Sequence, residues 1–429
     1  MFRKIIFHLF TVLLIAMSLE ACSKKEDAPP EIVILSPGEL QAFVAGDSIP
    51  VIADIHHSSE ITSVKVSLLN SEYITVVQPR YFYPGNSSFV LDILFATDIS
   101  LASGAYNLLI SASGSGNTRN TYVSLMISGE QWMFERMLAV CNQNNLKTPV
   151  YEFDLQGNYH KIIDFDHACV DSDISSFYRQ IYLVKPEPSV LFAYNLDDLS
   201  VDYTFGAIPP YPEFFDVDCS IFLSTDIATA NGEIISLNQG GGQIMKTSTS
   251  ADTVPRLVLR NFSRYIAYCE KRSGPKQFIR QYWDTGILRA DLPVDIKVIQ
   301  LYGIDALRVV LFGNGDGQAC IYTYWVDDVF VDQKIEIPGG EMKCVVQTGT
   351  AEFLIGHEDG IFYYDNASGS VTEWIPGKNA DAMAYDLLRD IVVVADGKDV
   401  SFYHAADGSP AGEAVLPYPV LQLHVQNNK

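Results

Sequence analysis

Positive charge is scarce in this sequence, which has 29 Lys and Arg residues against 52 Asp and Glu residues and a formal net charge of −23. Nucleic acids and anionic membrane surfaces are bound through clustered cations. We therefore expect no nucleic-acid partner. Hydrophobic residues make up 48% of the 429 positions, which predicts a folded chain with room for two or three domains.

The hydrophobic run near the N-terminus is too short to span a bilayer. It covers residues 5–17, whereas a membrane-spanning helix needs about 20 residues. The run follows Arg3 and Lys4, and this order suits the core of a secretory signal peptide. We predict that residues 1–21 are such a signal peptide.

The end of this run carries a motif. Glu20, Ala21 and Cys22 resemble the bacterial lipobox, although Glu20 departs from the small or apolar residue usual there. The resemblance implies that Cys22 is lipidated, becomes the mature N-terminus and anchors the chain to a membrane. Ordinary secretory cleavage near Ala21 and an uncleaved anchor are the alternatives.

A short polar tether, residues 22–30, follows the lipobox. Its Lys25, Glu26 and Asp27 resemble the signal that sends lipoproteins of Bacteroidota to the outer face of the outer membrane. The resemblance implies an outer-membrane location facing the cell exterior. A plain solvated linker is the alternative.

Cysteine pairs at metal-binding spacing are absent. The six cysteines after Cys22 contain no CxxC motif, and each lies in or beside an apolar run. An exported protein can pair its cysteines, but we interpret most of these as small buried hydrophobic residues. No zinc site is expected. The six are Cys141, Cys169, Cys219, Cys269, Cys320 and Cys344.

Residues 31–128 predict a small β-sandwich. In residues 61–69, Val64, Val66 and Leu68 alternate with polar residues, as in a sheet with one face buried and the other exposed to solvent. About seven such strands in about 100 residues predict an immunoglobulin-like sandwich, and residues 104–108 resemble the Gly-x-Tyr entry to a late strand of such modules. The expected strands are 31–35, 49–55, 61–69, 73–77, 89–94, 105–112 and 120–127.

Residues 129–429 repeat a strand pattern seven times. An apolar strand recurs at steps of 39 to 44 residues, at 137–141, 181–184, 221–224, 265–269, 308–312, 352–355 and 390–395. Most copies are followed by a turn, an aromatic strand, a polar strand, a Pro and an inner strand. This period predicts a seven-bladed β-propeller with four strands per blade; six or eight blades are the alternatives.

The two ends of this repeat are complementary. The domain begins with the second strand of a blade and ends with an inner strand at 420–425, so we predict that one C-terminal strand and three N-terminal strands share the closing blade. Residues 383–397 resemble NHL- and quinoprotein-type propellers. With the lipobox and the sandwich, the whole chain resembles surface lipoproteins of Bacteroidota, which implies binding or scaffolding beside an outer-membrane transporter.

Candidate ligand-binding residues lie in the turns and blade crossings expected on one face of the propeller. Aromatic, carboxylate and amide groups suit a glycan or a peptide. The alternative is that each is a solvated turn residue. The candidate binding face comprises Asp166, His167, Tyr211, Arg272, Asp316, His357, Glu358, Asp359 and Tyr418.

We expect a binding or scaffold protein rather than an enzyme, because the sequence has no GxSxG, HExxH, P-loop or EF-hand motif. No cofactor or metal is expected. The alternative is a propeller lyase or hydrolase with His167 and His357 as acid and base. Asp164, Asp166, Asp171 and Asp173 cluster in sequence, so a calcium ion is an alternative there, although their spacing matches no known calcium loop.

Overall fold

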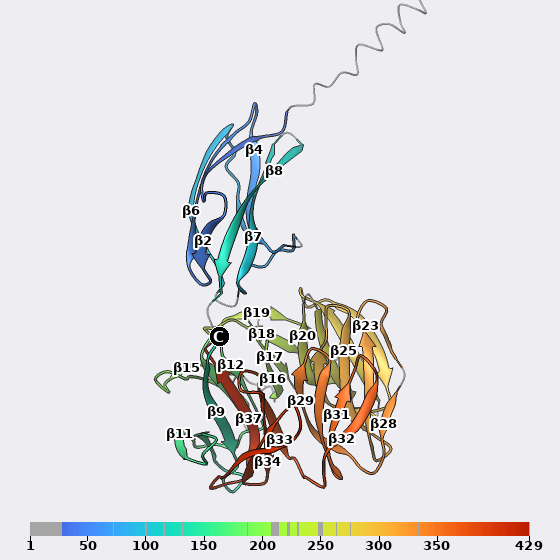
Figure 1. The fold of residues 1–429 in the computed structure, drawn as a ribbon. Coiled ribbons are helices and arrows are strands. Elements are labelled where there is room, and N and C mark those ends of the chain that lie inside the picture. The colour runs from blue at the N-terminus through green and yellow to red at the C-terminus, as the bar shows by residue number, and fades with distance from the viewer. Residues whose placement is uncertain are drawn as a thin grey trace, which may run out of the picture. The chain divides into compact units, whose positions relative to one another are not determined.

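The computed structural model in Figure 1 describes two compact units, Met1–Gln131 and Trp132–Lys429. Cys22 lies outside the described residues, and no helix within them is long and apolar enough to cross a membrane. All regular elements of the described part are β-strands. The described residues are 28–71, 73–98, 101–114, 116–129, 132–186, 188–206, 214–220, 224–229, 231–247, 252–262, 264–274, 276–332 and 334–428.

The first unit consists of two sheets that share one apolar core. Strand order is β1-β3-β6 in one sheet and β2-β8-β7-β4-β5 in the other. Alternate residues of β3 and β7 are buried in the same cluster, including Val51, Ile55, Leu108 and Ile110. The strands are β1 (Glu31–Ser36), β2 (Gln41–Val44), β3 (Ser48–His56), β4 (Ile61–Leu69), β5 (Arg80–Phe82), β6 (Ser88–Ala96), β7 (Gly104–Gly114) and β8 (Asn117–Ser128).

Two features of this unit differ from the predicted strands. The predicted strand 73–77 is absent from the described residues there, where Thr75 makes only an isolated bridge to Leu69. Strands β2 and β5 were not expected. They have four and three residues at the edges of their sheet, and so short a segment shows no periodic pattern.

The second unit contains seven sheets in its described residues, each built on four antiparallel strands, and Figure 1 shows them side by side. The first sheet has the order β11-β10-β9-β37, and the others follow the chain. The strands of the first three are β9 (Phe134–Cys141), β10 (Thr148–Phe153), β11 (Tyr159–Phe165), β37 (Val420–Asn427), β12 (Asp171–Ser175), β13 (Gln180–Lys185), β14 (Val190–Asn195), β15 (Val201–Gly206), β16 (Phe214–Ser220), β17 (Ser224–Thr229), β18 (Ile234–Leu237) and β19 (Gln243–Lys246).

The remaining four sheets repeat this order, and in one of them β28 pairs with β26 beside β27. Their strands are β20 (Thr253–Asn261), β21 (Arg264–Lys271), β22 (Gln277–Trp283), β23 (Leu288–Val294), β24 (Lys297–Gly303), β25 (Arg308–Gly315), β26 (Gln318–Trp325), β27 (Phe330–Val331), β28 (Ile335–Ile337), β29 (Met342–Gly349), β30 (Glu352–His357), β31 (Gly360–Asp365), β32 (Ser370–Pro376), β33 (Ala382–Asp386), β34 (Ile391–Asp396), β35 (Asp399–His404) and β36 (Pro410–Val415).

The inner strands of neighbouring sheets contact one another in a closed cycle. Strand β12 contacts β16, and the contacts continue through β20, β24, β29 and β33 to β37, which returns to β12. Apolar clusters fill the spaces between sheets. The second strand of most sheets is buried along nearly its whole length, as β13, β21 and β34 show, and this explains its continuous apolar sequence. This ring of four-stranded sheets is the arrangement of a β-propeller.

One strand of the repeat lies elsewhere than predicted. The expected strand 221–224 is replaced by β17 (Ser224–Thr229), and residues 221–223 lie outside the described part. Asp226 interrupts the apolar pattern of β17, yet it is fully buried. Its carboxylate accepts hydrogen bonds from Ser224 and Ser236, which satisfies the buried charge.

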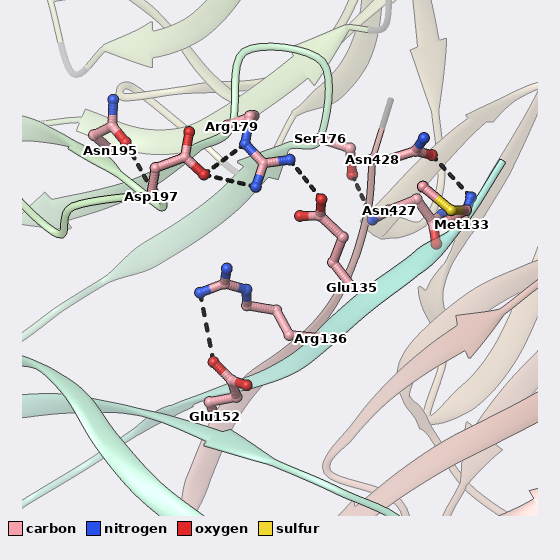
Figure 2. A network of polar contacts seen from close by, with 10 residues as sticks. All are labelled: Met133, Glu135, Arg136, Glu152, Ser176, Arg179, Asn195, Asp197, Asn427 and Asn428. Carbon is pink, nitrogen blue, oxygen red and sulfur yellow. Dashed lines mark hydrogen bonds and ion pairs between the residues drawn. The ribbon is translucent and has the colours of Figure 1, made fainter. Parts of the chain in front are cut away.

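Polar contacts hold the two ends of the second unit together, as Figure 2 shows. The backbone N–H of Met133 donates to the side-chain oxygen of Asn428 at 2.8 Å, and the N–H of Asn427 donates to Ser176 at 3.2 Å. Arg179 donates to Glu135 of β9 and to Asp197, both at 2.7 Å. These contacts join the start of β9 and the end of β37 to the second sheet.

The six described cysteines are free thiols. Cys141, Cys269 and Cys320 are buried, and the other three are half-buried. Burial raises the pKa of Cys141 to about 12 and that of Cys169 to about 12. These thiols therefore pack as small apolar groups, and the described cysteines form no disulfide.

Candidate functional site

The predicted face is formed by turns between second and third strands together with the links that enter the inner strands. Hydrogen bonds join these two kinds of segment in several sheets. The N–H of Arg272 donates to the Asp252 carbonyl at 2.9 Å, and the N–H of Gly397 donates to the Asp381 carboxylate at 2.9 Å. In the first sheet, Lys147 of the turn forms an ion pair with Asp166 of the link. The turns and links therefore lie on one edge of the ring.

Most described members of the candidate binding face are solvated turn residues. Asp166, Arg272, Asp316, Glu358 and Asp359 are exposed. Asp316 has a φ of 53°, a left-handed conformation that Asp tolerates in tight turns. Tyr418 is half-buried against the apolar cluster between the first and last sheets. Tyr211 lies outside the described residues.

His357 does not reach this face. It ends β30, pairs with Met342 and Gly360, and has 0% exposure. Its Nδ1 accepts the N–H of Asp359 at 3.1 Å, and its ring packs edge-on to Phe362 with centroids 5.1 Å apart. No contact in the described residues joins it to His167, and its side chain is fully buried whereas that of His167 is half-buried.

His167 lines a hollow, which we call the His167 hollow. Its volume is about 370 Å³, and its walls come from three segments. They are the turn between β9 and β10, the link from β11 to β12, and the end of β13 with the residue after it. The lining residues are Asn145, Leu146, His167, Ala168, Lys185 and Pro186.

The imidazole of His167 is held by aromatic neighbours. Its ring lies edge-on to Phe165, with centroids 5.2 Å apart, and is tilted against Phe192 at 6.2 Å. Burial lowers the pKa of His167, the positive charge of Lys185 lowers it further, and Asp166 opposes both. The ring is therefore predominantly neutral at pH 7 and can offer both a flat face and a hydrogen-bonding nitrogen.

A row of half-buried carboxyl groups lies on the inner strands of the second and third sheets, and we did not select it from the sequence as a site. Asp171 and Asp173 belong to β12, while Asp216 and Asp218 belong to β16. The Asp-x-Asp spacing repeats after 45 residues, close to the period of the sheets, and was the signal available in the sequence.

Each of these carboxylates binds backbone of the next inner strand. Asp171 accepts the N–H of Val217 at 2.7 Å, and Asp173 accepts the N–H of Cys219 at 2.7 Å. One sheet further on, Asp216 accepts the N–H of Val258 at 2.7 Å. An inner strand is the edge of its sheet and leaves N–H groups unpaired. The carboxylates supply the missing acceptors.

Burial changes the protonation of this row. It raises the pKa of Asp171 from 3.8 to about 6 and that of Asp173 to about 7. The pKa values of Asp216 and Asp218 are also raised well above 3.8, by burial and by repulsion among these carboxylates. These groups can retain protons near neutral pH. No group of three or more His, Cys, Asp or Glu in the described residues is placed to hold a metal ion.

The other two acidic residues of the sequence cluster lie apart from this row. Asp164 is exposed and forms an ion pair with Lys161 at 2.7 Å, and Asp166 pairs with Lys147 at the surface. The four aspartates therefore belong to two environments, one exposed and one half-buried. The calcium alternative gains no support from this arrangement.

Comparison with known proteins finds similarity in fold only. No family model matches the sequence, and no curated protein matches it. A quinoprotein alcohol dehydrogenase-like protein of Bacteroides thetaiotaomicron has a TM-score of 0.47 and 11% identity, covering 93% of this chain and 99% of its own. The Cps50 (Swd1) β-propeller domain of Myceliophthora thermophila has a TM-score of 0.47 and 9% identity, covering 59% of this chain and 87% of its own.

A third similar structure is a chain of the mitotic checkpoint complex. Its TM-score is 0.49 with 12% identity, and the alignment covers 68% of this chain and 86% of its own. At such identities a likeness concerns the fold and carries no ligand, reaction or partner over to this chain.

Proposed function

We propose that the protein is a lipid-anchored binding or scaffold lipoprotein of the outer membrane, displayed on the cell exterior, and that its second unit is the binding module. The observation that carries the binding role is the His167 hollow, which brings side chains from three separate segments around one volume of about 370 Å³. That volume falls within the range of small-molecule sites. The ligand class that we favour is a glycan or a peptide.

The architecture in this proposal is a seven-bladed propeller closed by one C-terminal and three N-terminal strands. Its support is the pairing of β37 with β9, from Val420 opposite Cys141 to Asn427 opposite Phe134, together with the cycle of inner-strand contacts. Such closure removes the free edge that an open array of sheets would expose.

We propose that the first unit is an immunoglobulin-like spacer between the anchor and the propeller. Its support is Tyr106 near the start of β7, whose hydroxyl donates to the Ala102 carbonyl at 2.9 Å. A tyrosine that bonds to backbone a few residues upstream, at the start of a late strand, is typical of such sandwiches. The two-sheet order of this unit agrees with the same interpretation.

The anchor and the location rest on residues 22–27 of the sequence, with Cys22 as the lipidated residue. A lipid on Cys22 holds the acidic body at the membrane without contact with anionic headgroups, which its charge disfavours. An outer-membrane transporter is the partner that this location suggests.

Protease treatment of intact cells tests the display. We expect added protease to degrade the wild-type protein while a periplasmic marker survives. Cys22→Ser should lose incorporation of labelled palmitate and leave the outer-membrane fraction. A wild-type protein that survives the protease, in cells whose lysate degrades it, would show that display is wrong. Palmitate on the Cys22→Ser variant would show that the anchor is wrong.

A further inference from the structure

The walls of the His167 hollow combine apolar surface with positive charge. Leu146 is 72% exposed at its rim, and Ala168 and Pro186 add apolar lining. The charged member of the lining is Lys185, which is half-buried. A ligand in this hollow would therefore meet an apolar wall, the His167 ring and one ammonium group.

The ammonium group of Lys185 is available to a ligand. Within the described residues it forms no ion pair, whereas Lys147 at the same edge is paired with Asp166. The chain as a whole has a net charge of −23, so a concave site whose lysine has no ion-pair partner among the described residues stands out from its surroundings. Half-burial reduces screening by solvent and strengthens attraction for an anion.

The other polar groups of the hollow, those of His167 and Asn145, leave room for a carboxylate. His167 is held against Phe165 and Phe192, and its neutral ring can donate or accept one hydrogen bond. Asn145 already receives a hydrogen bond from Asn142, at 2.5 Å to its side-chain oxygen. A carboxylate can pair with Lys185 while the body attached to it covers Leu146 and Pro186.

We propose that the His167 hollow binds a carboxylate attached to an apolar-faced body, with Lys185 as the residue that selects the charge. This inference rests on the proposed binding function and names the ligand chemistry of the same site. Two sources supply this chemistry, the free C-terminus of a peptide and an acidic sugar.

Matched ligand pairs test the charge preference on the full chain. The probes are N-acetyl-phenylalanine against its amide for the peptide source, and glucuronate against glucose for the sugar source, with affinities measured by NMR titration. We expect at least one carboxylate to bind about fivefold tighter than its neutral partner, as a charge-assisted contact gives. The pair that shows the preference identifies the source.

Two variants that lose one positive charge each, at different sites, show whether Lys185 causes the preference for the carboxylate. Lys185→Met should abolish the preference, Lys185→Arg should retain it, and Lys398→Met should leave it unchanged. Lys398 is an exposed lysine in the turn between β34 and β35, so its loss changes the net charge equally. Circular dichroism of each variant checks the fold.

The imidazole gives a second measurement. With labelled histidine, the His167 signal is assigned among the eight histidines by its loss in His167→Gln. A bound carboxylate beside the ring should raise the pKa of His167, because a nearby negative charge favours the charged form.

Three results would overturn the proposal: equal affinities within both ligand pairs, a preference that survives Lys185→Met, or a His167 signal that the bound carboxylate leaves unmoved. These results concern purified protein and are independent of the protease experiment on cells. A displayed lipoprotein with no carboxylate preference would refute the ligand chemistry alone, and a hidden protein that binds carboxylates would refute display alone.

Discussion

Strand β37 contacts two inner strands through side chains of opposite character. Toward β33, Val420 and Leu423 pack in the apolar cluster between the first and last sheets. Toward β12, Gln422 donates to Asp171 at 2.5 Å, and Ser172 bonds to Gln422 and to His424. One strand therefore contacts its two neighbouring inner strands with an apolar side and a polar side.

The difference between the two sides shows that the ring can be joined in two ways. Apolar packing is insensitive to pH and depends on volume. Carboxyl groups supply hydrogen-bond acceptors for the N–H groups at the edge of a sheet. Taking a charged carboxylate out of water costs free energy, so such a group tends to take up a proton. The polar side should therefore respond to pH, and the apolar side should respond to the size of its side chains.

The largest change in the free energy of unfolding is expected from a substitution on the apolar side of β37. Leu423 is 7% exposed within the cluster. Leu423→Ala should lower the free energy of unfolding by about 2–4 kcal/mol, because it removes buried methyl groups and leaves a cavity. Urea denaturation followed by tryptophan fluorescence measures the change, and its size should be the same at pH 6.5 and pH 8.

Leu421 of the same strand is the matched control. It is 38% exposed, so Leu421→Ala should change stability by less than about 0.5 kcal/mol. If the two variants lost equal amounts of stability, strand propensity rather than the apolar cluster would determine how tightly β37 is held in its sheet.

The second effect is a loss of stability of the wild-type chain as pH rises from 6.5 to 8. The pKa of Asp173 is about 7 in the folded chain and near 3.8 when unfolded, so the folded state holds a proton that the unfolded state has released. Asp216 and Asp218 act in the same direction. Stability should fall by roughly 1–2 kcal/mol across this interval, measured by urea denaturation at each pH.

Most of the opposing effect of His424 lies below this interval. Burial lowers the pKa of His424 to about 4, which adds stability as pH rises from 4 to 6.5. Asp173→Asn keeps an acceptor for the N–H of Cys219 and removes the charge. It should therefore reduce the slope to the share of Asp216 and Asp218, and it should be more stable than the wild type at pH 8. Asp166→Asn, at an exposed ion pair, should leave the slope unchanged. A wild-type slope of zero would contradict the buried protonation.

The apolar part of the ring was predictable from the sequence because its pattern is continuous. The predicted strands 265–269, 308–312 and 352–355 lie within β21, β25 and β30. Strand β12 was not predicted, because its sequence Asp-Ser-Asp-Ile-Ser has the composition of a loop. These aspartates accept backbone N–H groups of β16, which lies about 45 residues further along the chain, so the sequence of β12 alone cannot show this role.

The candidate site was predictable in position but not in composition. Turns and links carry Asp166 and His167 to one edge, as the repeat indicated. Lys185 was overlooked because a lone lysine at a strand end has no pattern, and the His167 hollow needs turns that are about 20 residues apart. Burial of His357 depends on the packing of β29 and β31 on either side of it, which the spacing of residues in the sequence does not encode.

The smallest effect is expected where β37 ends. The side-chain oxygen of Asn428 accepts the N–H of Met133 at 2.8 Å in an exposed contact, and the N–H of Asn428 donates to the Met133 carbonyl at 2.9 Å. Asn428→Ala should cost about 0.5–1 kcal/mol and speed amide exchange at Met133, because it removes one acceptor and leaves the backbone bond. Asn428→Asp retains the acceptor and should retain protection. A loss of stability from Asn428→Ala as large as that from Leu423→Ala would mean that the polar end, rather than the apolar side, holds β37 in place.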